Sequence, residues 1–343
     1  MVFYDCTLVD MYGETPDLVQ YSRKGENQFL VALALSRDGM PLSYEILPGN
    51  TPDIDTVQGA LERLKKRFSI GQCIFVADRG MVSEKKLKKI DSLGYKYIVG
   101  VRLNQWKEVK EEVLTTPGRY TKVKENLHVK EVNLDNKRYL ICYNPLRAAR
   151  DKKIREEMVK KLEEEIDGLD PESKKAAALY GHRYKGRFLR KLKDNTLRID
   201  RTRIREDEKY DGKYILRTSE KELDKDEIAI TYKRLCRIER SFRSLKSLND
   251  LQPVYHYKDR RIKSHVSVCM LAHLLERHME QKLENEGLEM TAAKALETLG
   301  RMRVSKMSLN DIEFLIRTNS TEEINEIFQK LHFRPPSRVE ELT

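Results

Sequence analysis

Residues 75–80 combine an apolar segment with an acidic side chain in a position suited to chemistry. The apolar run of residues 73–77 ends at Asp78, and Gly80 follows two residues later. Such a run predicts a buried strand. An acidic residue at the carboxyl end of a strand lies where α/β sheets place their reactive groups. Asp78 is therefore a candidate site residue, although an isolated aspartate in such a position is more often a turn former.

Residues 230–246 have the periodicity of one helix. At about 100° per residue, a phenol, an acid and two cations fall in one narrow stripe; they are Tyr232, Glu239, Arg243 and Lys246. An apolar face lies beside this stripe, made by Ile238, Phe242 and Leu245. The pattern favours a site that handles phosphate and metal over a solvated surface. A simple solvated face remains the alternative for the two cations.

A third acidic residue, Asp5, lies in a segment of residues 2–9 whose alternation predicts a strand. If this strand neighbours the one that ends at Asp78, then Asp5, Asp78 and Glu239 can converge. Hard divalent cations such as Mg²⁺ prefer oxygen ligands. Two such ions about 4 Å apart would stabilise the attacking and the leaving oxygen of an in-line phosphoryl transfer. Arg243 and Lys246 would neutralise DNA phosphates beside them.

The composition favours a polyanionic partner. The 343 residues include 66 Lys and Arg against 55 Asp and Glu, which gives a formal net charge of +11. No apolar run approaches the ~20 residues of a membrane span, and the first residues lack a signal-peptide layout. The five cysteines include no CxxC pair, which argues against structural zinc and a disulfide framework. We expect a soluble, intracellular protein without a membrane partner.

The order of predicted elements indicates an α/β fold with a mixed sheet. Strands are expected over residues 2–9, 27–35, 41–47, 73–77 and 95–101, and helices over 51–68 and 83–93. Asp38 and Gly39 supply a hairpin turn. Residues 102–229 differ, because they predict a small, largely antiparallel segment that includes a charged helix over 148–165. The core then resumes with a helix over residues 230–246 and another from about residue 258 to residue 283. Two shorter helices are expected after these, and a capping box that starts at Ser320 opens the second of them.

These patterns predict four parts of the chain. Residues 1–102 form the first part of the core and residues 103–229 form an insertion. Residues 230–283 form the second part of the core, and residues 284–343 form an α-helical tail. Trp106, near the start of the insertion, could stack on a displaced base or simply pack. His265, His273 and His278 show no metal-ligand spacing and are expected on a helix surface or in a core.

The chain resembles the DDE transposases of prokaryotic insertion sequences, in the group whose β-rich insertion separates the second Asp from the Glu. The resemblance extends over nearly the whole chain, and the combination of its motifs is specific. The matching segments are residues 4–7, 49–50, 76–80, 94–100, 210–212, 238–246 and 260–265. It implies an RNase H-like core in which Asp5, Asp78 and Glu239 bind two Mg²⁺ ions, with Mn²⁺ as a possible substitute. The Tyr-Arg-Glu-Lys signature of the family corresponds to Tyr232, Glu239 and Lys246.

Two details of the motifs affect these assignments. The Arg of the signature is replaced by Leu235, so Arg234, Arg237 or Arg243 could bind the phosphate in its place. Arg243 is the best candidate, because it lies on the helical stripe of Glu239 and the other two arginines do not. Asp10 is an alternative to Asp5 as a ligand. Asp5 is preferred because Thr7 follows it at the spacing of the family. Asp5 also lies close to the start of the chain, so we expect a chain without the amino-terminal region that binds the ends of the element.

The resemblance implies a transposase catalytic core for DNA transposition and recombination. It would hydrolyse a phosphodiester at the end of a transposable element and transfer the 3′-hydroxyl to target DNA, as a homodimer on double-stranded DNA. The prokaryotic cytoplasm, at the nucleoid, is the expected location. Tyr232, Arg237, Arg243 and Lys246 would contact the DNA. A non-catalytic DNA-binding remnant of a decayed element is the alternative, and a stand-alone RNase H-like nuclease is a third hypothesis.

Overall fold

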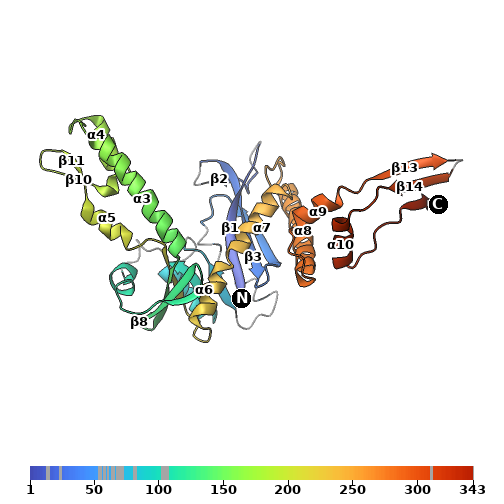
Figure 1. Ribbon diagram of the computed structural model, residues 1–343, viewed down its shortest axis with the longest axis horizontal. Coiled ribbons are helices and arrows are strands. Elements are labelled where there is room, and N and C mark those ends of the chain that lie inside the picture. Colours follow the sequence, from blue (N-terminus) through green and yellow to red (C-terminus); the bar gives the residue numbers. More distant parts are fainter. Residues whose placement is uncertain are drawn as a thin grey trace. The chain divides into compact units, whose positions relative to one another are not determined.

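The computed structural model describes residues 1–12, 16–22, 25–52, 56, 59, 62, 66, 73–79, 83–101, 108–309 and 312–342. The chain forms two compact units (Figure 1). Unit 1 comprises Met1–Gly71 and Leu235–Thr343, and unit 2 comprises Gln72–Arg234. Most of the helix predicted over residues 51–68 lies outside the described residues, as do Gly80 and Trp106. Within the described part, every helix is too short or too polar to span a bilayer.

Unit 1 begins with antiparallel strands that follow directly from their sequence patterns. β1 (Val2–Asp10) pairs with β3 (Asn27–Ser36), and β2 (Gln20–Tyr21) and β4 (Pro41–Pro48) also pair with β3. Every residue from Gln28 to Leu35 is buried, which explains the continuous apolar run of this strand. The predicted hairpin turn is confirmed, since Gly39 has a φ of +83° between β3 and β4.

Two helices of unit 1 pack near these strands. α7 (Cys236–Ser247) packs on β1, and α8 (Asp259–Asn285) packs against α7 and β4 (Figure 1). The sequence places apolar side chains of α7 three and four residues apart, and Ile238 and Leu245 are fully buried. The helix predicted over residues 258–283 is confirmed by α8.

The last part of unit 1 is not entirely helical, contrary to the prediction for residues 284–343. α9 (Ala292–Leu299) and α10 (Glu322–Lys330) share a core with Leu283. The strands β13 (Val304–Leu309), β14 (Ile312–Arg317) and β15 (Val339–Leu342) form an antiparallel sheet. Ile312, Phe314 and Ile316 do have the two-residue period of a strand, but the pairing of β14 with β15 joins distant segments. The N-cap of α10 is Thr321, one residue after the predicted Ser320.

Unit 2 contains a mixed sheet in the order β5-β6-β12-β9-β8-β7. β5 (Ile74–Ala77) and β6 (Lys96–Val101) are parallel, and α2 (Glu84–Ser92) connects them. The remaining strands are antiparallel: β7 (Thr121–Lys124), β8 (Leu127–Leu134), β9 (Lys137–Tyr143) and β12 (Lys213–Thr218). β12 lies between β6 and β9, so the strands of the predicted insertion extend the sheet that begins with β5 and β6.

A helical segment of unit 2 separates β9 from β12. It contains α3 (Pro145–Ile166), α4 (Lys174–Gly181), the short hairpin β10 (Leu189–Lys191) and β11 (Leu197–Ile199), and α5 (Arg201–Glu208). These elements enclose their own apolar core around Leu162 and Phe188. The unit also includes a π-helix (Val109–Val113), a 3₁₀ turn (Gly186–Phe188) and α6 (Lys225–Lys233).

The predicted α/β class is confirmed. Along the chain, antiparallel strands come first and parallel strands joined by a helix come next, which is the chain order of an RNase H-like core. The four predicted parts divide the chain differently from the two compact units, and their boundaries stay a prediction.

Candidate functional site

Asp5 is a polar residue in the middle of a largely buried strand. Its neighbours Phe3 and Tyr4 on β1 are each 1% exposed, whereas Asp5 itself is half-buried. One carboxylate oxygen, Oδ1, accepts a hydrogen bond from the backbone N–H of Cys6 at 2.8 Å. Asp5 lies opposite Leu33 in the pairing with β3. The functional role of Asp5 stays a prediction.

The alternative ligand Asp10 lies at the end of the same strand. Its Oδ1 accepts a hydrogen bond from Nε2 of the buried Gln28. This bond gives Asp10 a role in the pairing of β1 and β3, where the two residues lie opposite each other. The preference for Asp5 as the ligand stays a prediction.

Glu239 and Lys246 are carried by α7, the helix that packs on β1. Glu239 is exposed in the first turn of α7. Nζ of Lys246, in the last turn, donates a hydrogen bond to the carbonyl oxygen of Leu8 at 2.6 Å. Because Leu8 follows Asp5 by three residues on β1, this bond ties the helix that carries Glu239 to the strand that carries Asp5.

Tyr232 does not share a helix with Glu239, which corrects the prediction of a single helix over residues 230–246. α6 ends at Lys233 and α7 begins at Cys236. At the junction the backbone N–H of Arg234 donates to both Ile230 O and Thr231 O, and that of Ile238 donates to Leu235 O, three residues back. The three-residue bond of Ile238 interrupts the regular four-residue ladder of an α-helix where α7 begins, and with it the phase on which the predicted stripe depended.

Asp78 and Tyr232 are in direct contact within unit 2. Asp78 is exposed and follows β5 immediately, as predicted. The Tyr232 hydroxyl donates a hydrogen bond to Asp78 Oδ1 at 2.9 Å. The Tyr232 ring also stacks on Tyr214 of β12, with ring centroids 6.0 Å apart and planes at 26°. Burial and the negative charge of Asp78 raise the pKa of Tyr232, so the phenol keeps its proton and remains a donor to the carboxylate.

Gly100 on β6 makes room for this contact. A Cβ atom at this position would lie 2.3 Å from the Tyr232 hydroxyl oxygen and 3.2 Å from the backbone nitrogen of Arg79. The first separation is far below van der Waals contact, so a side chain at residue 100 would displace the phenol from Asp78. Gly100 belongs to a segment used for the family resemblance, but nothing in the sequence pattern indicates this steric role.

We expect Gly100→Ala to lower any metal-dependent activity by about 10- to 100-fold, because the carboxylate of Asp78 loses the donor that orients it. Tyr232→Phe removes the same hydrogen bond without a clash and should have an effect of similar size. The rate of metal-dependent DNA cleavage by each variant measures this effect, and thermal unfolding shows whether the two variants keep the fold. Equal turnover of Tyr232→Phe and the unsubstituted protein would show that the bond does not orient a working carboxylate.

The two predicted phosphate-binding arginines, Arg237 and Arg243, lie on α7 two residues before and four residues after Glu239. Arg237 and Arg243 line a groove between α7 and α8 together with Arg240. Nη1 of Arg237 donates to the carbonyl oxygen of Arg37 at 2.9 Å. Arg243 is exposed. Their predicted contact with DNA stays a prediction.

Within the described residues, no group of three or more His, Cys, Asp and Glu side chains has the arrangement of a metal site. What unit 1 brings together is the strand of Asp5 and the helix of Glu239 and Lys246. What unit 2 brings together is Asp78 and Tyr232. Three further groups take part in these contacts and were not predicted from the sequence. They are the Leu8 carbonyl, which accepts from Lys246, the Tyr214 ring, which stacks on Tyr232, and Gly100, which leaves room for the Tyr232 hydroxyl.

Comparison with known proteins identifies the family. The family model described as a transposase DDE domain matches residues 3–275. The chain belongs to this family. Membership in the transposase DDE domain family supports a function in DNA transposition, and members generally use divalent metal ions.

One solved structure that matches is a piggyBac transposase in a synaptic complex with hairpin DNA. The match covers 85% of this chain and 50% of that one, at 9% sequence identity and a TM-score of 0.45. The chain therefore spans about half the length of that transposase. None of the curated proteins matches the chain.

Proposed function

We propose that this chain is the catalytic core of a DNA transposase. Water would attack a phosphodiester at the end of the element, and the bond between phosphorus and the 3′ oxygen would break to leave a 3′-hydroxyl and a 5′-phosphate. The freed 3′-hydroxyl would then attack a phosphodiester of target DNA, form a new bond to phosphorus and displace the 3′ oxygen of the target. The observation that carries this proposal is the family match over residues 3–275, which includes all three acidic residues.

Asp5, Asp78 and Glu239 would be the metal ligands. Their donor atoms are all carboxylate oxygens, the type preferred by Mg²⁺ and by Mn²⁺. The bond from Tyr232 uses one oxygen of Asp78 and leaves the other oriented for a cation. Two bound ions would supply stabilisation of the attacking and leaving oxygens. The chain itself would hold the carboxylates in place, through Tyr232 for Asp78 and through the tie between Lys246 and β1 for the helix of Glu239.

The remaining expected features follow from the same proposal. Arg237, Arg243 and Lys246 would contact DNA phosphates, and Tyr232 would lie beside the scissile strand. The protein would act as a homodimer on double-stranded DNA at the nucleoid. The large basic excess, +11 over the whole chain, supports a polyanionic partner of this kind.

The insertion would hold the flanking strand or the hairpin end of the DNA. A cavity of about 610 Å³ in unit 2 supports this role, because its lining includes three aromatic rings and two lysines. The rings are those of Tyr120, His128 and Tyr143, and the lysines are Lys152 and Lys213. The ring centroids of Tyr120 and Tyr143 are 6.0 Å apart, and both open onto the cavity. Aromatic faces next to lysines suit an unpaired base and its phosphate.

Tyr120→Ala should weaken binding of hairpin-ended DNA about tenfold, since stacking of one base contributes about 1–3 kcal/mol, and should leave binding of a blunt duplex nearly unchanged. Tyr184→Ala is a matched control in the same unit, because Tyr184 is 58% exposed and outside the cavity. Fluorescence anisotropy with the two DNA forms measures both affinities. Equal losses for the two tyrosine variants would contradict the assignment of the cavity.

Strand joining tests the proposed function. Purified protein is incubated with a labelled duplex that carries an element end, a supercoiled target and Mg²⁺. Joined products that disappear in EDTA support a transposase. Cleavage without joining would instead favour an RNase H-like nuclease, and salt-sensitive DNA binding without either product would favour a non-catalytic remnant.

A further inference from the structure

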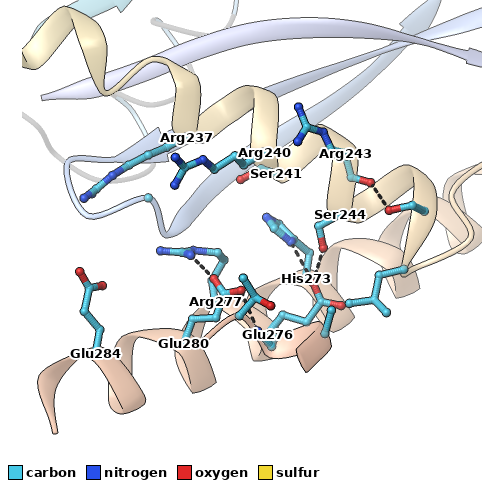
Figure 2. A pocket seen from close by; sticks show the side chains of 16 residues that line it. Arg237, Arg240, Ser241, Arg243, Ser244, His273, Glu276, Arg277, Glu280 and Glu284 are labelled. Atoms are coloured by element: carbon cyan, nitrogen blue, oxygen red, sulfur yellow. Dashed lines mark hydrogen bonds and ion pairs between the residues drawn. The ribbon is translucent and has the colours of Figure 1, made fainter. Parts of the chain in front are cut away.

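A charged groove in unit 1 lies between α7 and α8. It is about 500 Å³ in volume and is lined by α7, by α8 with the residues that follow it, and by Gly39 of the β3–β4 turn. Figure 2 shows Arg237, Arg240 and Arg243 extending from α7 and His273, Glu276 and Arg277 on the facing helix. At about 100° per residue, Arg237 lies roughly 160° around the α7 axis from Glu239, Arg240 about 100° and Arg243 about 40°. The groove therefore begins opposite Glu239 on α7 and extends at Arg243 to the side of the helix that carries Glu239.

Two arginines of the groove are held in place by the β3–β4 turn. Nη1 of Arg237 donates to Arg37 O at 2.9 Å, and Nη2 of Arg277 donates to Asp38 O at 3.3 Å. Arg277 also forms an ion pair with Glu280. A guanidinium has five N–H donors, so each of these arginines is oriented by the protein and still has donors to offer. Such pre-organisation lowers the entropy cost of binding a ligand.

The other two arginines of α7 have no partner of this kind. Within the described residues, the guanidinium groups of Arg240 and Arg243 make no hydrogen bond or ion pair, and both side chains are exposed. They lie three and six residues after Arg237, so the α-carbons of successive arginines rise by about 4.5 Å along the helix. A row of planar forks at this spacing suits neighbouring oxyanions, because arginine binds phosphate in a bidentate manner.

The lining of the groove includes a buried histidine, His273, that has an unpartnered ring nitrogen within the described part of the chain. His273 is 1% exposed, and its Nδ1 lies 3.4 Å from Glu276 Oε2. Its Nε2 is buried and has no hydrogen-bond partner within the described part of the chain. A buried polar atom without a partner is costly. A ligand in the groove would supply the missing partner.

The acidic residues of the groove are largely engaged within the protein. Ser244 Oγ donates to Glu276 Oε2 at 2.6 Å, and Glu280 accepts from Arg277 and from the backbone N–H of Ala292. Burial alone would raise the pKa of Glu276, but hydrogen bonds from His273 and Ser244 outweigh it and lower the pKa, so Glu276 stays charged. Glu276 and Glu280 are thus matched by donors, whereas Glu284, the third carboxylate of the lining, is exposed. The four arginines of the lining outnumber its three carboxylates, which leaves a positive balance for a ligand.

We propose that this groove is a binding site for phosphoryl groups, suited to two or more neighbouring phosphates. Arg240 and Arg243 would bind them as forks, Arg237 and Arg277 would close the end at the β3–β4 turn, and His273 Nε2 would contact an oxygen or a bridging water. The phosphates could belong to a nucleic-acid strand or to a small polyphosphate compound. Arg237 and Arg243 are also the arginines proposed above to contact DNA phosphates, so the nucleic-acid form of this proposal rests on the proposed function.

Calorimetric titration with inorganic tripolyphosphate in EDTA tests this site without metal. We expect Arg240→Gln/Arg243→Gln to bind tripolyphosphate at least tenfold more weakly than the unsubstituted protein. Arg334→Gln/Arg338→Gln removes the same charge from exposed positions of unit 1 outside the groove, and it should bind as the unsubstituted protein does.

Equal affinity of the two arginine double variants for tripolyphosphate would overturn the proposal, since binding would then follow overall charge. A second titration, with a labelled DNA duplex in the same buffer, identifies the source of the phosphates. Weaker DNA binding by Arg240→Gln/Arg243→Gln than by its control, with competition by tripolyphosphate, assigns the groove to nucleic acid. Unchanged DNA binding together with lost tripolyphosphate binding assigns it to a small phosphorylated compound.

Discussion

Glu239→Gln is expected to reduce metal-dependent DNA cleavage by about a thousandfold while leaving the fold intact. Loss of a ligand charge removes several kcal/mol of transition-state stabilisation, and each 1.36 kcal/mol is a factor of ten in rate. Glu239 is exposed on α7, and the core of that helix is made by other residues, so the substitution removes little packing. Single-turnover cleavage of an end-bearing duplex in Mg²⁺ measures the effect.

Glu326→Gln is the matched control for this prediction. Glu326 is exposed on α10 and the substitution removes the same charge from the same unit. Its cleavage rate should equal that of the unsubstituted protein. A rate for Glu239→Gln within a few-fold of this control would exclude Glu239 as a ligand.

The largest loss of stability is expected from Arg155→Ala. Arg155 on α3 is only 4% exposed, and its guanidinium donates to both carboxylate oxygens of Asp211 at 2.6 and 2.7 Å. Asp207 and Glu208 lie within 4 Å of it as well. Removal of the arginine leaves these acids without their shared partner, and breaking a buried pair in this way costs about 3–5 kcal/mol.

Arg150→Ala provides the reference for this measurement, because Arg150 is exposed on the same helix. Urea unfolding followed by circular dichroism should show a much lower midpoint for Arg155→Ala and a nearly unchanged midpoint for Arg150→Ala. Similar midpoints for both variants would mean that the ion pair with Asp211 contributes nothing to the stability of unit 2.

This ion pair also explains one of the motifs on which the family resemblance rests, residues 210–212. Asp211 binds Arg155, and Gly212 adopts a φ of +64° in close contact with α3. A Cβ atom at Gly212 would lie 2.4 Å from the carbonyl oxygen of Asn144 and 2.7 Å from the backbone nitrogen of Ala148. The motif therefore fixes the base of α3 against β12, a structural role that the sequence alone did not distinguish from a catalytic one.

Local patterns were sufficient to predict most core elements to within a few residues. β3 is a continuous apolar run, β1 alternates, and α2 and α8 show helical periodicity, so each could be identified from its own residues. The charged helix predicted over residues 148–165 is present as α3, and it carries same-helix ion pairs such as Arg147 with Asp151.

Features that depend on distant residues were missed or misassigned. The insertion of β12 between β6 and β9 joins segments seventy or more residues apart along the chain, and β14 pairs with β15 across α10. The break between α6 and α7 includes a three-residue turn from Ile238 to Leu235 that helical periodicity does not reveal. For the candidate site, Asp78 and Glu239 were predicted from their positions and from the family resemblance, and their role as ligands stays a prediction. The bond from Tyr232 to Asp78 and the space provided by Gly100 needed three-dimensional structure.

Manganese binding tests most directly the central claim that Asp5, Asp78 and Glu239 form one metal site. Electron paramagnetic resonance measures free Mn²⁺ in titrations of the unsubstituted protein and of Asp5→Asn, Asp78→Asn, Glu239→Gln and Asp10→Asn. We predict that each of the first three substitutions weakens binding at least tenfold and that Asp10→Asn does not. Normal binding by Asp5→Asn together with loss of binding in Asp10→Asn would contradict the assignment and make Asp10 the ligand on β1.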